Sequence, residues 1–224
     1  MHAHLKELKN KTMEQKLRQV TDDFLKRIQE NLPNEEADKP GVIGVVGMIG
    51  SGRTLLAKTL VENIKGAVLI SANSARYLLK EVGLSWGENV YAVLLNATEW
   101  LIKNEYIAVY DGNQIDKNRR DAIKQLTDKL GVKYYLIKII TSEATAEKYL
   151  REKYSQEPKN TFEDFWPGTD ADDIVQNLHE RNKDFYAIDQ EDPGPEFFAE
   201  IENEETIEKF KQKAVEIAQK ISKQ

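Results

Sequence analysis

Residues 42–54 read VIGVVGMIGSGRT, and the residues after them read LLAKTLVENI. The apolar, β-branched start predicts a buried strand, and the second segment predicts a helix. Between them, glycines allow a tight turn whose backbone N–H groups, together with the positive end of the helix, bind anions. The spacing from Gly47 to Gly52, followed by a basic residue and Thr54, is that of a phosphate-binding loop, except that arginine replaces lysine. We expect the phosphates of a nucleotide to contact Gly47, Gly50, Ser51, Gly52, Arg53, Thr54 and Leu55.

Composition and charge exclude several classes of function. The 224 residues include no cysteine, which rules out disulfides, thiolate nucleophiles and cysteine metal sites. There are three histidines, two of them at the extreme N-terminus, so a histidine metal cluster is not expected. A net charge of −6 argues against broad nucleic-acid binding. Because there is no apolar run of about 18 residues and no signal-peptide pattern, we expect a cytoplasmic protein without a membrane segment.

Strand-like and helix-like segments alternate along much of the chain. Short apolar segments predict strands at residues 67–70, 106–110, 133–140 and 196–201. Apolar residues at helical spacing predict helices at residues 75–82, 88–104, 117–130 and 206–221. Together with the strand before the glycines, this order predicts an α/β fold with three layers, doubly wound around a mainly parallel five-stranded sheet.

Two segments fall outside this alternation. Residues 1–40 contain an amphipathic helical pattern and end in a charged, proline-containing linker, so we assign them to an N-terminal extension of the 41–224 domain. We expect the extension to pack on that domain, with binding to a partner or to a second copy as the alternative. Residues 142–190 are charged and helix-prone, and we interpret them as a lid. Its aromatic cluster consists of Phe162, Phe165 and Trp166.

Polar side chains follow the predicted strands at the edge where ligands of a doubly wound sheet bind. We expect Thr54 and Asp111, which ends the strand YIAVYD, to hold Mg²⁺ beside the phosphates. Arg76, about one helical turn beyond the 67–70 strand, is placed to bind an acceptor phosphate through its guanidinium. These residues fit phosphoryl transfer, which also needs cations that neutralise negative charge in its transition state. The candidates are Arg119, Arg120, Lys148, Arg151, Lys153 and Arg181.

The chain resembles P-loop kinases of the nucleoside-monophosphate kinase and polynucleotide kinase type over residues 42–221. Four segments carry the resemblance: GMIGSGRT, NSAR, VYDGNQIDKNRR and FFAEIENEETIEKF, which begin at residues 47, 73, 109 and 197. The resemblance implies that ATP or GTP and Mg²⁺ are the cofactors and that Arg76 contacts the acceptor phosphate. It also implies that the loop at residues 202–204, including Glu202 and Asn203, lies against the nucleotide base.

Two residues depart from the pattern of these kinases. Arg53 replaces the loop lysine and keeps its positive charge on a broader, planar group. Asn73 replaces an acidic residue; it can position a hydroxyl group but cannot accept its proton. The catalytic residues that we predict are Arg53, Asn73, Arg76, Asp111 and Arg151.

The leading functional hypothesis is a kinase that transfers the γ-phosphate of ATP or GTP to a small nucleotide-like or phosphorylated acceptor. The alternative is a catalytically weak pseudokinase that binds nucleotide as a regulator or scaffold, with the N-terminal helices as its interaction surface. An NTP-hydrolysing switch and a polynucleotide 5′-end kinase are further alternatives, and the acidic charge counts against the second of these.

Overall fold

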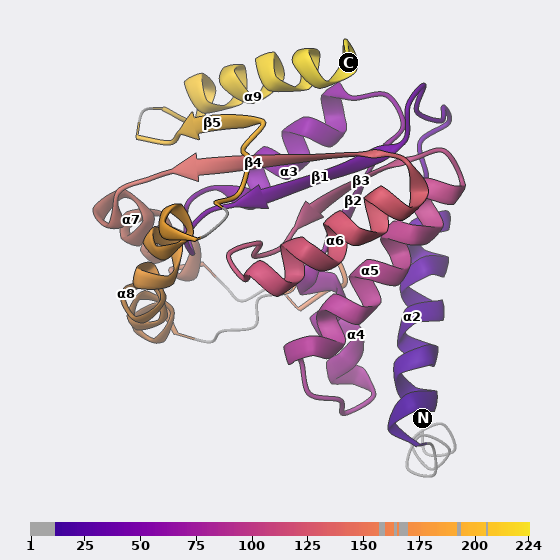
Figure 1. Ribbon diagram of the computed structural model, residues 1–224. Coiled ribbons are helices and arrows are strands. Elements are labelled where there is room, and N and C mark those ends of the chain that lie inside the picture. The colour runs from indigo at the N-terminus through magenta and orange to yellow at the C-terminus, as the bar shows by residue number, and fades with distance from the viewer. Residues whose placement is uncertain (1–11, 157–159, 164, 166–169, 192–193, 205) are drawn as a thin grey trace.

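The computed structural model describes residues 12–224, apart from 157–159, 164, 166–169, 192–193 and 205. Its strands form one sheet in the order β2-β3-β1-β4-β5, in which all neighbours are parallel (Figure 1). The predicted doubly wound α/β fold is confirmed, and the sheet is wholly rather than mainly parallel. The strands are β1 (Gly41–Val46), β2 (Ala67–Ser71), β3 (Ile107–Asp111), β4 (Lys133–Ile140) and β5 (Ala199–Glu202).

Strand β1, which leads into the glycine-rich loop, lies at the centre of the sheet. It pairs with β3 on one side and β4 on the other, and all six of its residues are buried. Its continuous apolar run follows from this position, because a central parallel strand is covered on both faces. At Gly44 an added Cβ would lie 2.6 Å from the hydroxyl oxygen of Tyr134, so a larger residue would force that ring to shift.

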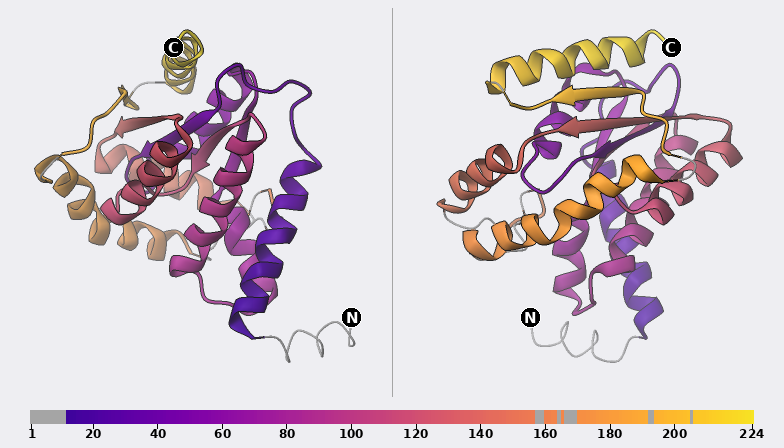
Figure 2. Two further views of the ribbon diagram at one scale, coloured as in Figure 1. Left: turned by 45° about the vertical axis from the view of Figure 1, so that its right-hand side comes forward. Right: turned by 60° about the vertical axis from the view of Figure 1, so that its left-hand side comes forward.

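Helices cover both faces of the sheet (Figures 1 and 2). Successive residues of β1 point to opposite faces: Val42 packs with the helices of one face and Ile43 with those of the other. On the first face lie α2 (Met13–Gln29), α4 (Ala72–Glu81), α5 (Gly87–Lys103) and α6 (Lys117–Leu130). On the second face lie α3 (Arg53–Asn63) and α9 (Ile207–Ser222).

The lid expected at residues 142–190 is built mainly from two helices at the carboxyl end of the sheet, α7 (Glu143–Tyr154) and α8 (Ala171–Ala187), followed by the 3₁₀ turn Ile188–Gln190. The two helices pack on each other and on the end of β1 around buried Val46, Leu150 and Leu178. In their connection, Phe162 and Phe165 are described, whereas Trp166 lies outside the described residues.

Helix α2 packs on the domain that follows it. Thr12 and Gln15 form a capping box that starts the helix. Its buried residues Val20, Phe24 and Ile28 join the core formed with α4 and α5. The structure therefore shows this helix docked in cis; the rest of the predicted N-terminal helical segment, up to residue 11, lies outside the described residues.

Helix α4 and strand β5 begin at different residues from those predicted from the sequence. The helix expected at residues 75–82 begins at Ala72, because the Ser71 hydroxyl accepts a hydrogen bond from the Asn73 N–H at 3.2 Å. The expected strand at residues 196–201 is shorter and begins at Ala199. Within the described residues, no helix is both long enough and apolar enough to cross a membrane.

Candidate functional site

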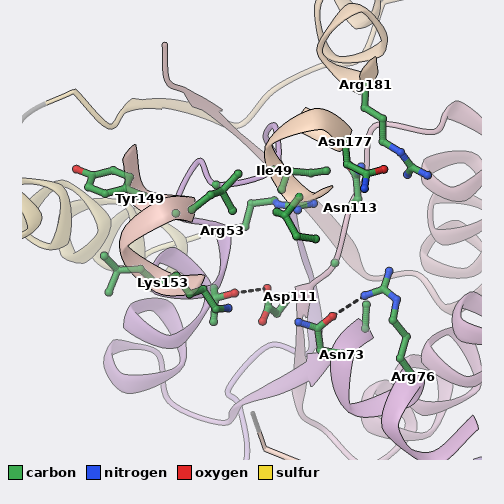
Figure 3. A pocket seen from close by; sticks show the side chains of 18 of the residues that line it. Ile49, Arg53, Asn73, Arg76, Asp111, Asn113, Tyr149, Lys153, Asn177 and Arg181 are labelled. Atoms are coloured by element: carbon green, nitrogen blue, oxygen red, sulfur yellow. Dashed lines mark hydrogen bonds between the residues drawn. The ribbon is translucent and has the colours of Figure 1, made fainter. Parts of the chain in front are cut away.

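A cavity of about 850 Å³ lies at the carboxyl ends of β1, β2 and β3 (Figure 3). The glycine-rich loop and α3 line one part of it, α4 and α5 another, and α7 and α8 the rest. Five of its described lining residues are basic and two are acidic, although the protein as a whole is acidic. The basic residues are Arg53, Arg76, Arg119, Lys153 and Arg181; the acidic ones are Asp111 and Asp173. Such an excess of cations in an enclosed site attracts anions.

The loop before α3 has a backbone that only glycines accommodate. Gly50 has φ +80° and Gly52 has φ +96°, both in the left-handed region. An added Cβ would also lie 2.6 Å from the carbonyl oxygen of Ala146 at the first position, and 2.7 Å from Nδ2 of Asn203 at the second. Among the described residues, no side chain caps the start of α3. The first N–H groups of this helix are therefore available to an anion in the cavity.

Thr54 and Asp111 come together as expected for a metal site. The Thr54 hydroxyl donates a hydrogen bond to Oδ1 of Asp111 at 3.0 Å. Burial raises the pKa of Asp111, while the charge of Arg53 and the hydrogen bond from Thr54 act in the opposite direction. Among the described residues, no group of three or more acidic or histidine side chains is arranged to hold a metal ion by itself. This donor set fits Mg²⁺ in its usual phosphate-bound form, because that ion keeps several waters and takes the remaining ligands from phosphates.

Arg53 lies beside Asp111 with an unsatisfied donor. Its buried Nη1 has no hydrogen-bond partner among the described residues. Burial lowers the pKa of Arg53, and the charge of Asp111 opposes this effect. A buried cationic donor without a partner is destabilising unless an anion occupies the adjacent space. The arginine is therefore placed to contact a phosphate bound in the loop.

Asn73 and Arg76 form a pair on α4 across the cavity from the loop (Figure 3). Nη1 of Arg76 donates a hydrogen bond to Oδ1 of Asn73 at 2.6 Å. The pKa of Arg76 is lowered by burial, and the nearby positive charges of Arg119 and Arg181 lower it further. The guanidinium groups of Arg76, Arg119 and Arg181 are therefore close enough to influence one another, and all three residues line the cavity.

Arg119 and Arg181 complete this cationic region from different elements. The guanidinium carbon of Arg119 lies 3.6 Å from the ring centroid of Tyr91, a stacked geometry that fixes its plane. Its Nη2 is 3.5 Å from the exposed carboxylate of Glu88. Arg181 belongs to α8, one helical turn after Asn177, and both line the cavity (Figure 3).

The structure does not bring every predicted residue to this cavity. Arg151 is exposed on α7 and forms ion pairs with Glu147 at 2.8 Å and Asp172 at 2.7 Å. Lys148, on the same helix, faces solvent beside Glu152. Neither residue lines the cavity among those described.

Arg120 and Glu202, two other predicted site residues, also lie away from the cavity among the described residues. Arg120, buried in α6, donates to the backbone carbonyls of Gln114 and Ile115 and pairs with Glu191, so its contacts are structural. Glu202 is exposed on β5 and does not line the cavity, whereas its neighbour Asn203 does. Asn203 is buried behind the loop, where its Nδ2 donates to the Ser51 carbonyl at 2.8 Å.

Several cavity residues had no prediction from the sequence. Asn113 directly follows the strand-end Asp-Gly, and Asn177 is four residues before Arg181 on one helix face, so both had a detectable positional signal. The aromatic and apolar residues had no such signal, because their spacing is that of ordinary core positions. Examples are Trp86, Tyr91, Tyr149 and Ile207.

Comparison with known proteins places the chain in a family. A family model described as an AAA domain matches residues 42–165. No curated protein sequence matches the chain. Solved structures do: a gluconokinase from Sinorhizobium meliloti 1021 has 15% identity and a TM-score of 0.53, with 82% of this chain and 94% of that chain covered. For the Deinococcus radiodurans tunicamycin resistance protein the values are 17%, 0.50, 82% and 96%.

A third structure, Chaetomium thermophilum Kti12 in complex with ADP-AlF3, has 13% identity and a TM-score of 0.53, with 79% of this chain and 96% of that chain covered. At such identities these likenesses concern the fold, and they confirm the P-loop kinase-like architecture expected from the glycine-rich loop. The family match spans more than half of the 224 residues. This protein is therefore a member of the AAA domain family, with a P-loop kinase-like fold.

Proposed function

We propose that this protein is a phosphotransferase that moves the γ-phosphoryl group of ATP or GTP to a small nucleotide-like or phosphorylated acceptor, with Mg²⁺ as the metal cofactor. The observation that carries the proposal is the composition of the cavity. A phosphate-binding loop and the Thr54–Asp111 pair lie at one end, and the three guanidinium groups of Arg76, Arg119 and Arg181 lie at the other. Phosphoryl transfer needs this arrangement, because its catalysis rests on positioning and charge neutralisation.

At the donor end, the residues of this chain bind and orient the triphosphate. The backbone N–H groups before and within the first turn of α3 bind the phosphate oxygens, and Arg53 donates to them with its unpartnered Nη1. Bound Mg²⁺ would neutralise charge on the phosphates, held by Thr54 and, directly or through water, by Asp111. Tyr149, Asn203 and Ile207 all line the cavity, and we assign the nucleotide base to the part that they form.

The proposed kinase domain is residues 41–224, and its 142–190 segment contributes its own residues to the cavity. Residues 41–224 supply the donor and acceptor ends of the cavity, and the 142–190 segment supplies Lys153, Asn177 and Arg181 from its two helices. We propose that this segment acts as a lid over bound substrates, which would keep water away from the transferring phosphoryl group.

One observation favours the alternative of a pseudokinase. Arg53 and Asn73 both stand where active P-loop kinases of the resembling type have lysine and a carboxylate. If catalysis has been lost, the double variant Arg53→Lys/Asn73→Asp would restore phosphotransfer, on the order of 10³-fold for a transition-state cation placed correctly. If the natural protein is a working kinase, Arg53→Lys alone leaves activity unchanged or lowers it.

The experiment has two stages. Calorimetry with ATP and GTP, with and without Mg²⁺, measures binding at the loop. ATP consumption is then followed with a panel of nucleoside monophosphates and small alcohols, for the natural protein and for both variants. Binding together with turnover in the natural protein supports the proposal. Binding with turnover in the double variant alone establishes the pseudokinase, and the absence of nucleotide binding refutes both.

A further inference from the structure

Among the described residues, the acceptor end of the cavity contains no buried carboxylate that could serve as a proton acceptor. Of its two carboxylates among the described lining residues, Asp111 accepts a hydrogen bond from Thr54 at the donor loop. The other, Asp173, is exposed in the first turn of α8. A hydroxyl group that attacks phosphorus must lose its proton, and efficient kinases provide a positioned base for it.

Asn73 lines the cavity, and its contact with Arg76 indicates a positioning role. Its Oδ1 accepts a hydrogen bond from Arg76 at 2.6 Å. An amide oxygen orients the guanidinium without cancelling its charge, whereas a carboxylate at the same position would form an ion pair and neutralise it. Asn73 therefore keeps Arg76 both fixed and electrostatically available to a ligand.

Arg119 is also held in place without full neutralisation. Tyr91 contacts the guanidinium face at 3.6 Å. Two carboxylates lie near the group, that of Glu88 at 3.5 Å from Nη2 and that of Asp116 at 4.0 Å from Nε. Both are solvent-exposed, at 87% and 42%, so water screens their charges. The buried Nε of Arg119 has no hydrogen-bond partner among the described residues. Arg181 adds a third positive charge to the same region. Three guanidinium groups suit a ligand with two negative charges and several oxygen acceptors, which describes a phosphate monoester.

We infer that the nucleophile of the transfer reaction is an ionised phosphate oxygen of a phosphomonoester, not a hydroxyl group, and that Asn73 positions Arg76 for this acceptor. The inference rests on the proposed phosphotransferase function. An oxygen of the acceptor phosphate forms a new bond to the γ-phosphorus of ATP, and the bond from that phosphorus to the β–γ bridging oxygen breaks. The electron pair leaves with ADP, and the acceptor becomes a diphosphate. No proton has to be removed, because the second ionisation of a phosphate monoester has a pKa of about 6.

The test compares matched acceptors that differ only in the phosphate. With Mg·ATP, the pairs are AMP and adenosine, ribose 5-phosphate and ribose, and glycerol 3-phosphate and glycerol. We expect turnover with at least one phosphate ester, a diphosphate product, and at least 100-fold lower kcat/KM for each unphosphorylated partner. Transfer to an unphosphorylated member, or to a hydroxyl group of an ester, would overturn the inference.

Variants separate the roles of the residues. Asn73→Asp should lower kcat/KM for the phosphate ester by tenfold or more, because it neutralises Arg76 and repels the acceptor; with a hydroxyl acceptor the same change would raise it. Arg119→Ala should weaken ester binding by tenfold or more, whereas Arg18→Ala, an exposed arginine of α2, is the matched control and should not. If Asp173→Asn abolished turnover, that carboxylate would be a base and the inference would be wrong.

Binding measurements distinguish failure of this inference from failure of the proposed function. The protein is first saturated with Mg·ADP, whose binding reports on the donor loop, and is then titrated with each ester by calorimetry. Binding of ADP without binding of any phosphomonoester refutes the inference and leaves the donor site intact. If ADP itself does not bind, the proposed function and the inference fall together.

Discussion

Asp111 is the residue at which the function of the site becomes sensitive to pH. An aspartate ordinarily has a pKa of about 3.9, and burial raises the pKa of Asp111 above that value. The carboxylate is charged above its pKa in the folded protein and neutral below it. As the pH falls, Asp111 therefore loses its charge earlier than an ordinary aspartate does, and the attraction for Mg²⁺ that we propose for it would be lost as well.

We predict that the affinity for Mg·ATP decreases as the pH is lowered from 8 toward 5, with part of this decrease absent in Asp111→Asn. Protonation of the nucleotide affects both proteins equally, so the difference between their pH profiles isolates this carboxylate. The variant should also lose most of the dependence of nucleotide binding on Mg²⁺. Calorimetry across this pH range makes the measurement; parallel profiles, with Mg²⁺ dependence retained, would assign Asp111 a structural role.

Asn203 connects the last strand to the phosphate-binding loop. In the variant Asn203→Ala, the Ser51 carbonyl loses its hydrogen bond of 2.8 Å, while the Thr141 hydroxyl, 3.5 Å away, remains as a weaker donor. We predict a decrease of about 0.5–1.5 kcal/mol in the free energy of unfolding, the usual net contribution of one hydrogen bond, together with weaker nucleotide binding. Asn96→Ala is the matched control, since that side chain is exposed on α5. Equal urea midpoints for the two variants would contradict the prediction.

Individual residues also show what the sequence could and could not predict. The loop from Gly47 to Thr54, and the meeting of Thr54 with Asp111, followed from spacing alone, because backbone geometry and strand ends fix them. The placement of Arg151 did not, because which side of α7 faces the cavity depends on how the helix packs, and this arginine is paired with Glu147 and Asp172 instead. Spacing cannot distinguish a cation at the cavity from one in a surface ion pair.

At the scale of elements, α2 tests whether the N-terminal extension is part of the domain. Phe24 is 1% exposed and packs edge-to-face on Phe162, with ring centroids 5.8 Å apart. We predict that Phe24→Ala lowers the free energy of unfolding by about 3–5 kcal/mol, the usual cost of truncating a buried phenylalanine. Urea unfolding measures this change. The control is Met13→Ala, at an exposed position of the same helix, which should have little effect.

The same measurement addresses the alternative in which α2 binds a partner or a second copy. If the helix docks in cis, the unfolding midpoint of the natural protein does not change with protein concentration, since no association is involved. A midpoint that rises with concentration, or a negligible effect of Phe24→Ala, would indicate that the helix leaves the domain to bind elsewhere.

Helices and strands were easier to predict than the contacts between them. The bounds of α6 and β4 agree with the predictions from periodicity, because a glycine at position 131 terminates the helix and an apolar run defines the strand. The contact of Phe162 with α2 could not be predicted in this way. It joins residues far apart in the chain, through a loop whose aromatic residues are equally compatible with an isolated hydrophobic turn.

For the whole molecule, ligand binding and stability are linked. A nucleotide that binds only the folded state should raise the free energy of unfolding by about 2.7 kcal/mol at a concentration of 100 times its Kd. We predict this stabilisation for ATP and ADP, and a much smaller one for adenosine, because we expect the basic residues that line the cavity to bind phosphates. Thermal unfolding with each ligand makes the comparison. Equal shifts for adenosine and ATP, or none for either, would show that the loop does not bind phosphate.

The strand order also has a consequence for folding during synthesis on the ribosome. Strand β1 pairs with β3 and β4, whose partner residues lie 66 and 92 positions further along the chain (Gly41 with Ile107 and with Lys133). Until residue 140 has left the exit tunnel, β1 is a hydrophobic segment with an unpaired edge. Such non-local pairing slows folding and leaves aggregation-prone intermediates. About 90 further residues must therefore emerge after β1 before the glycine-rich loop gains its supporting sheet.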